Sequence, residues 1–156
     1  MERHALLVWG DFACFSRPEI GKVERFTYPV MTPSAARGVF DSIYCKPTEF
    51  RWQIKRIEVL NPPRFIALRR NKTKEKVSVN AVKKWMENDE TPVPIFADVD
   101  KSFWGSDTRG RTQRQTMALK DVAYRIAAEI KPWPGFENRA TAFSAQFRRR
   151  ASQGKC

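Results

Sequence analysis

The stretch from Gln115 to Lys131, QTMALKDVAYRIAAEIK, constrains the fold more than any other part of the chain. Apolar side chains alternate with polar ones, first at positions 117 and 119 and then at 122, 124, 126, 128 and 130. Alternation over this length predicts a long β-strand, and the change of parity predicts one phase slip within it. An Ala-rich helix is the competing interpretation, but the alternation outlasts what helical spacing allows.

A second alternating stretch, FRWQIKRIEVL at 50–60, predicts another strand. Positions 50, 52 and 54 share one face and the apolar set then moves to 57 and 59, which predicts a β-bulge. A turn at Asn61-Pro62-Pro63 separates this strand from one beginning at Arg64. Residues 4–15, HALLVWGDFACF, are apolar on both alternating faces, so we expect a central strand covered on both sides. Residues 16–31 are expected to form a loop.

Two segments carry helical signals. Thr32 is a good N-cap, Pro33 suits the first helical position, and apolar side chains at 36, 39, 40 and 43 form one stripe. Pro47 prevents this helix from continuing. Apolar residues at 140, 143, 147 and 151 predict a second helix over 138–153, with Asn138 as its cap and Gly154 as its stop.

The resulting order is strand, helix, strand, irregular insertion, strand, helix. This is the α+β, ferredoxin-like (RRM-like) βαββαβ plan with its last strand missing. We expect a single domain over 1–156, with an insertion over 71–111. Its first part is basic and residues 87–107 are acidic, so a solvated excursion and a nucleic-acid contact loop are both open.

Charge is the strongest global signal. The formal net charge is +12 and the pI is about 10.1, which on one domain favours a polyanion partner, above all nucleic acid. A basic surface that serves only solubility is the alternative. The sequence has no apolar run long enough for a membrane span and no signal peptide, so we expect a cytoplasmic protein without a membrane partner.

Few residue types remain for catalysis. Three cysteines and one histidine lack metal-ligand spacing, and the sequence contains no phosphate-binding glycine loop, so we expect neither a metal nor another cofactor. His4 is expected to be a surface residue. Metal-free RNA cleavage needs proton transfer groups and cations, which Tyr44 and Lys46 offer at the end of the first predicted helix. A partly buried, purely structural Tyr44 is the alternative.

Basic residues are the candidates for RNA contact. Arg148, Arg149 and Arg150 either stabilise the end of their helix or face phosphates, and Arg37 faces either RNA or protein. The candidate RNA-binding residues are Arg37, Arg69, Arg70, Lys72, Arg109, Arg111, Arg114, Arg148, Arg149 and Arg150.

Three strings together resemble one known family: GDFACF at 10–15, YPVMTPSAARGVFDSIYCKP at 28–47 and TQRQTMALKDVAYRI at 112–126. They are similar to the CRISPR-associated pre-crRNA endoribonucleases of subtype I-C (Dvulg), within the RAMP superfamily. The resemblance implies metal-independent cleavage at the 3′ base of a CRISPR repeat hairpin, with a 2′,3′-cyclic phosphate product. It also implies retention of the guide's 5′ handle, beside the backbone and large subunits of the interference complex. Binding of duplex DNA stays open.

The resemblance places the family's catalytic tyrosine on Tyr44. Best-studied members add a Lys-His pair near the second helix, where this chain reads Ala140-Thr141-Ala142-Phe143. Substitution by Lys46 and weak activity are therefore both open. Members also continue beyond the last residues seen here, so the chain looks C-terminally truncated. The alternatives are a non-catalytic guide-RNA-binding subunit and a general basic DNA- or RNA-binding module.

Overall fold

The structure, a computed structural model, describes residues 2–20, 24–88, 91–92, 94–95 and 110–154. The chain divides into two compact units, one made of Met1–Ile66 and Met117–Cys156 and the other of Ala67–Thr116. The second unit encloses the expected insertion. The assignment of the whole chain to one domain stays a prediction.

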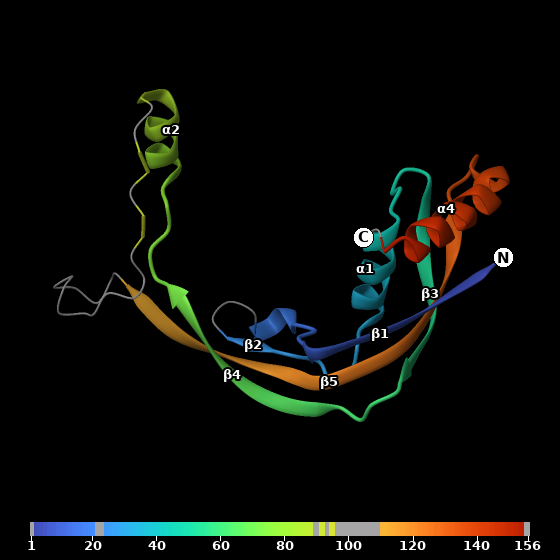
Figure 1. Ribbon diagram of the computed structural model, residues 1–156, viewed down its shortest axis with the longest axis horizontal. Helices are drawn as coiled ribbons and strands as arrows, with labels where there is room; N and C mark the ends of the chain where they lie inside the picture. The colour runs from blue at the N-terminus through green and yellow to red at the C-terminus, as the bar shows by residue number, and fades with distance from the viewer. Residues whose placement is uncertain (1, 21–23, 89–90, 93, 96–109, 155–156) are drawn as a thin grey trace. The chain divides into compact units, whose positions relative to one another are not determined.

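A five-stranded sheet is built around one strand, β5 (Figure 1). The strands are β1 (Arg3–Ala13), β2 (Arg25–Phe26), β3 (Phe50–Val59), β4 (Arg64–Thr73) and β5 (Arg111–Pro132). All four other strands pair with β5, which confirms the long strand predicted from alternation. Strand β5 begins at Arg111, earlier than the predicted Gln115, because β4 supplies a hydrogen-bonding partner there.

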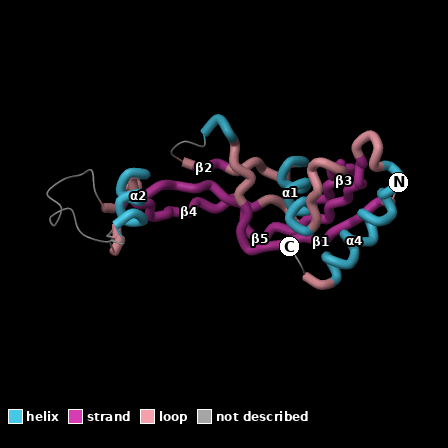
Figure 2. Tube along the Cα trace, turned by 90° about the horizontal axis from the view of Figure 1, so that it is seen from above, coloured by secondary structure: helices cyan, strands magenta, loops and turns pink. Residues whose placement is uncertain are grey.

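The first unit has α1 (Pro33–Ile43) and α4 (Ala140–Ser152) side by side on one face of the sheet (Figures 1 and 2). The Thr32 side chain accepts the Ala35 N–H at 3.2 Å, so the predicted cap of α1 is confirmed. Together with the strands, these helices make the fold α+β.

Asn138 as the cap of the second helix is wrong. It lies inside a 3₁₀ turn, Glu137–Arg139, that leads directly into α4, and Arg139 at the cap position makes no side-chain cap hydrogen bond. An N-cap needs an extended backbone, which a residue within a helical turn lacks. Gly154 does follow the helix with a positive φ of 63°, the conformation that favours glycine there.

Aromatic rings fill the space between the sheet and the two helices. The Trp52 ring lies 4.9 Å from Phe40 of α1 and 4.7 Å from Phe147 of α4, measured between centroids. All three side chains are buried. This packing joins α1, β3 and α4, because each contributes one of the rings.

The phase slip predicted in β3 is confirmed, whereas β5 pairs with β1 in one unbroken register from Arg3↔Glu129 to Ala13↔Leu119, so the slip predicted in β5 is not seen there. The pairing of β3 with β5 changes register between Ile54 and Arg56, which is the expected bulge. In β5, Asp121 has a φ of 52°, a conformation that Asp tolerates better than most residues. The Asn61 side chain donates to the Asp121 carbonyl at 2.9 Å, so the turn after β3 supports this kink.

The expectation that β1 is covered on both faces is wrong. Leu6 and Val8 pack against the core, whereas Leu7 and Trp9 are exposed. Both α1 and α4 lie on one face of the sheet, so apolar residues of the opposite parity in β1 receive no cover from them. The segment 16–31 contains, besides loop, a 3₁₀ turn at Pro18–Ile20 and β2.

The second unit contains parts of β4 and β5 and the helix α2 (Val79–Asn88). The sequence did not predict α2, and β4 runs to Thr73 although an insertion was expected from 71. The Ser78 side chain accepts the Ala81 N–H at 3.1 Å at the start of the helix. None of its residues is buried, although Val79, Val82 and Met86 recur at the spacing of one helical face. Among the helices described, none is long and apolar enough to span a bilayer.

Replacing Phe40 by Ala is expected to lower the free energy of unfolding by about 3–5 kcal/mol, because it removes a fully buried ring from the aromatic core. Urea denaturation followed by circular dichroism measures the change. Phe65→Ala, which removes an exposed ring of β4, is the control and should lower the free energy of unfolding by well under this amount. Equal losses in the two variants would contradict the assignment of the core.

Candidate active site at the end of helix α1

The backbone after α1 is held by side chains from three other elements. The Trp52 indole N–H donates to the Tyr44 carbonyl at 2.8 Å, and the Trp133 indole N–H donates to the Pro47 carbonyl at 2.7 Å. Arg150 of α4 donates to the Ile43 carbonyl. These bonds satisfy carbonyls that the helix end leaves without partners, so Tyr44 is fixed on a rigid support.

Tyr44 and Lys46 line one hollow of about 350 Å³ together with residues at the start of α4. The other lining residues are Arg139, Ala142, Phe143 and Gln146. The Tyr44 ring packs against Phe50, with centroids 5.3 Å apart. The structure therefore brings together the two residues that the sequence singled out, and adds the second helix as the opposite wall.

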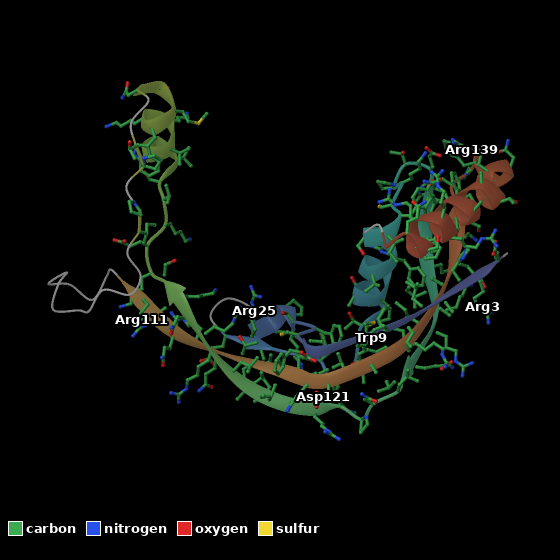
Figure 3. The ribbon with its side chains drawn as sticks, viewed as in Figure 1. Arg3, Trp9, Arg25, Arg111, Asp121 and Arg139 are labelled. Atoms are coloured by element: carbon green, nitrogen blue, oxygen red, sulfur yellow. The ribbon has the colours of Figure 1, made fainter. Side chains whose placement is uncertain are left out.

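Glu49 joins two cations at this hollow. Its Oε1 lies 2.8 Å from Lys46 Nζ and its Oε2 lies 2.8 Å from Arg139 Nη1. Figure 3 places Arg139 at the start of α4. One carboxylate thus holds an ammonium and a guanidinium that come from distant parts of the chain, and the three charges sum to +1.

The sequence reasoning missed Glu49 and Arg139. Glu49 stands three residues after Lys46, a spacing that a tight turn brings together, and the Glu49 N–H donates to the Lys46 carbonyl at 2.9 Å. That signal was available. Arg139 gave no local signal, because only the packing of α4 on α1 brings it near.

Two other reactive residues of the first unit, Cys45 and His4, are unsuited to catalysis. Desolvation raises the pKa of the Cys45 thiol and the neighbouring Asp41 carboxylate raises it further, so the reactive thiolate is disfavoured. His4 is buried rather than at the surface, which corrects the sequence expectation. Its Nε2 lies 3.0 Å from Ser144 Oγ, and its ring packs edge-on against Trp52 and Phe147.

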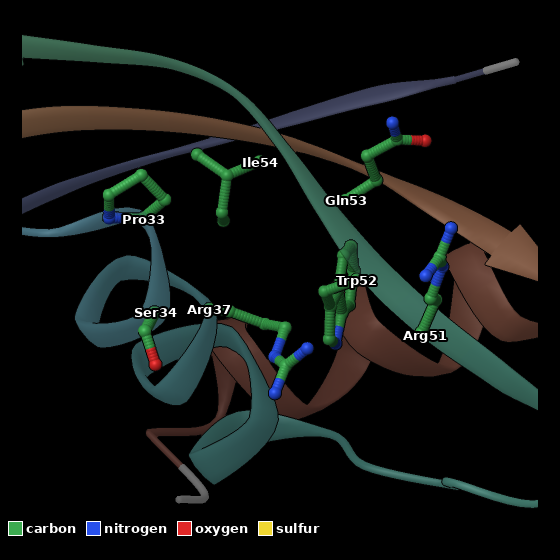
Figure 4. A pocket seen from close by; sticks show the side chains of 7 residues that line it. All are labelled: Pro33, Ser34, Arg37, Arg51, Trp52, Gln53 and Ile54. Carbon is green, nitrogen blue, oxygen red and sulfur yellow. The ribbon is translucent and has the colours of Figure 1, made fainter.

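Arg37 lines a different hollow, of about 370 Å³, between the start of α1 and β3 (Figure 4). Arg51 of β3 lines the same hollow, so two guanidinium groups border it. Arg37 Nε lies 3.6 Å from Asp41 Oδ2, one turn further along α1. Arg37 is exposed, and its role in RNA binding stays a prediction.

The remaining RNA-binding candidates fall into two groups. In the first unit, Arg148 pairs with Glu2 at 3.0 Å, Arg149 is exposed, and Arg150 has the structural bond to Ile43. In the second unit, Arg70 Nε donates to Thr116 Oγ1 at 3.0 Å. Its companions on β4 and β5 are Arg69, Lys72, Arg111 and Arg114. Arg109 lies outside the described residues.

Within the described ranges, no three His, Cys, Asp or Glu side chains are grouped closely enough to hold a metal ion.

Comparison with known proteins adds family evidence. Residues 5–156 match the family model described as CRISPR-associated protein (Cas_Cas5), or Cas5d. The CRISPR pre-crRNA endoribonuclease Cas5d of Mannheimia succiniciproducens is 39% identical over 156 residues, and that of Thermus thermophilus is 38% identical over 155. These matches cover 99% of this chain but 64% and 57% of the relatives, so the chain spans less than two thirds of their length.

Two solved structures share the fold at 18% sequence identity. A crystal structure of a CRISPR-associated protein matches 96% of this chain and 55% of its own, with a TM-score of 0.54. A functionally uncharacterized protein from Streptococcus mutans matches 99% of this chain and 57% of its own, with a TM-score of 0.57.

Folding stability is expected to fall with acidification through His4. Burial lowers the pKa of His4 from 6.5, the nearby Arg148 lowers it further, and Glu2 opposes the shift. Between this lowered value and 6.5 the unfolded chain binds more protons than the native one, so stability is full above about pH 6.5 and declines below it. Urea midpoints of the protein and of His4→Gln, compared at about pH 7.5 and about pH 5.5, measure the effect. An equal fall of the urea midpoint in the protein and in His4→Gln would contradict the role of His4.

Proposed function

This chain belongs to the Cas5d family of CRISPR-associated proteins, and we propose that it is a pre-crRNA endoribonuclease with its active site at Tyr44. The observation that carries the proposal is the hollow in which Tyr44, Lys46 and Arg139 meet. Its substrate is CRISPR repeat RNA, which the basic chain suits as a polyanion. Both curated relatives are named as enzymes of this kind.

The proposed reaction is attack of a 2′-hydroxyl on the adjacent phosphate. The 2′-oxygen loses its proton and bonds to phosphorus, the bond to the 5′-oxygen breaks, and that oxygen gains a proton. The products are a 2′,3′-cyclic phosphate and a free 5′-hydroxyl. This step consumes no water, and its proton transfers and its charge are within reach of side chains, so we propose that it is metal-independent.

Each group in the hollow has a part in this reaction. Tyr44 acts on the proton of the attacking 2′-hydroxyl, and Lys46 donates a proton to the leaving 5′-oxygen. Arg139 stabilises the negative charge that grows on the phosphate oxygens. Glu49 holds both cations in place through its two carboxylate oxygens. Because the carboxylate is shared, one positive charge is left over for the substrate.

We propose further that the first unit is a ferredoxin-like domain of the RAMP type. The order β1, α1, β3, β5, α4 and the position of β5 between β1 and β3 both support this plan. After cleavage, the protein retains the 5′ handle of the guide beside the backbone and large subunits of a type I-C interference complex. The exposed arginines of α1, α4, β4 and β5 are candidates for that contact.

A guide-RNA-binding subunit without catalysis is the second candidate function. Ala142 and Phe143 line the hollow, in the region where well-studied members of the family carry a Lys-His pair. A site that lacks this pair and whose Lys46 is engaged by Glu49 would bind the repeat without cutting it.

Tyr44→Phe is expected to abolish cleavage of a labelled repeat hairpin in the presence of EDTA and leave its affinity within about twofold, because only a hydroxyl is removed. Gel analysis of the products measures cleavage, and fluorescence anisotropy measures binding. Unchanged cleavage would remove Tyr44 from the mechanism. If the unsubstituted protein binds the hairpin without shortening it, the non-catalytic function holds instead.

Arg139→Gln is expected to lower the single-turnover cleavage rate by about a hundredfold, because a positioned charge is lost from the transition state. Arg139→Lys should recover part of the rate. Arg64→Gln is the control, since it removes an exposed guanidinium of β4 that does not line the hollow. Equal losses for Arg139→Gln and Arg64→Gln would show a general charge effect and no specific role for Arg139.

A further inference from the structure

The face of the sheet opposite α1 and α4 carries no helix among the described residues of the first unit (Figure 1). Strand register determines which side chains it presents, because paired residues of neighbouring strands point to the same side. We call this the outer sheet face. Its members by register are Arg3, Ala5, Leu7 and Trp9 of β1, Ala123, Arg125, Ala127, Glu129 and Lys131 of β5, and Arg51, Gln53, Arg56 and Glu58 of β3. Lys55, which lies in the bulge of β3, joins them through its ion pair with Glu129.

Trp9 of β1, labelled in Figure 3, is the aromatic member of the outer sheet face. It is 76% exposed, although it belongs to a well-paired strand. Its partner across the ladder is Ala123, and the neighbouring pair is Leu7 with Arg125. The small side chain at Ala123 leaves one side of the indole free of bulky groups. Trp9 and the exposed Leu7 beside it form one apolar patch, a feature that marks interaction sites.

The charge of the outer sheet face is strongly positive. Six cations, Arg3, Arg51, Lys55, Arg56, Arg125 and Lys131, stand against two carboxylates, Glu58 and Glu129, a difference of +4. Glu58 pairs with Arg56 at 2.8 Å and with Arg125 at 3.2 Å. Glu129 pairs with Lys55 at 3.3 Å and with Arg3 at 3.6 Å. Each carboxylate therefore orients two cations and neutralises only one.

We propose that the outer sheet face binds single-stranded nucleic acid, with one base stacked on Trp9 and phosphates contacted by Arg56 and Arg125. An uncovered sheet face with an open aromatic ring and surrounding cations offers the two interactions that unpaired nucleotides need. A protein partner fits less well, because the cores of protein interfaces are depleted of charge. Here the cations stand directly beside the exposed apolar side chains.

This site is separate from the hollow at Tyr44. Helix α1, which ends at Tyr44, packs on the opposite face of the sheet, and no residue of the outer sheet face lines that hollow. The inference therefore does not depend on whether the protein cleaves RNA. It assigns to the same unit a second surface, for a strand that is not base-paired.

Binding of a fluorescently labelled oligouridine of about ten nucleotides, which forms no hairpin, tests the proposal. Trp9→Ala should weaken binding by about tenfold and Trp9→Phe should retain most of the affinity, because phenylalanine still stacks. Met86→Ala removes an equally exposed apolar side chain, of α2, and is the matched control, with no change expected.

Salt dependence provides the second measurement. Arg56→Gln should reduce the slope of log affinity against log salt concentration by about 0.7, the value for one lost phosphate contact to a single strand. Thermal unfolding shows whether Trp9→Ala is folded. If it is not, the Arg56→Gln measurement by itself tests the proposal. Unchanged oligouridine affinity in a folded Trp9→Ala, or an unchanged slope in Arg56→Gln, would overturn the proposal. Loss of binding to a protein subunit with oligouridine affinity intact would identify a protein-docking face instead.

Discussion

The packing of Trp52 is the interaction on which the rest of the first unit depends. Its ring contacts Phe40 of α1, Phe147 of α4 and His4 of β1, so one side chain of β3 joins both helices to the sheet. Its indole N–H has the second task of holding the Tyr44 carbonyl. The core and the candidate active site therefore share a residue, and disorder in one would reach the other.

The candidate active site follows from how the two helices end and begin. The C-terminal end of α1 meets the N-terminal end of α4. The Glu49 carboxylate bridges Lys46 and Arg139 and holds both at the same hollow. A rigid support and a shared counter-ion are what a site for a charged transition state requires. Membership of the Cas5d family gives this arrangement a substrate, CRISPR repeat RNA, as a proposal to be tested.

Coverage of only one sheet face has a consequence of its own. Because α1 and α4 both pack on the same side, the opposite side keeps Trp9 and a set of cations in solvent. The sequence alone indicated a strand apolar on both faces, which is equally consistent with burial on both sides. The positions of the helices distinguish burial from exposure, and they led to the proposed single-strand surface.

Local patterns were enough to predict much of this fold. Alternation predicted β5 and also β3 with its bulge, and Thr32 with Pro33 predicted α1, because these signals arise from the period of a strand and from the unpaired groups of a helix end. Asn138 was wrongly predicted as a cap and His4 as a surface residue, because both outcomes depend on packing. Helix α2 was not predicted, although Val79, Val82 and Met86 lie at helical spacing. Tyr44 and Lys46 were found from residue chemistry and from resemblance. Only the tertiary structure decided that Arg139 joins them through Glu49, since residues 90 positions apart meet through long-range packing that no local pattern records.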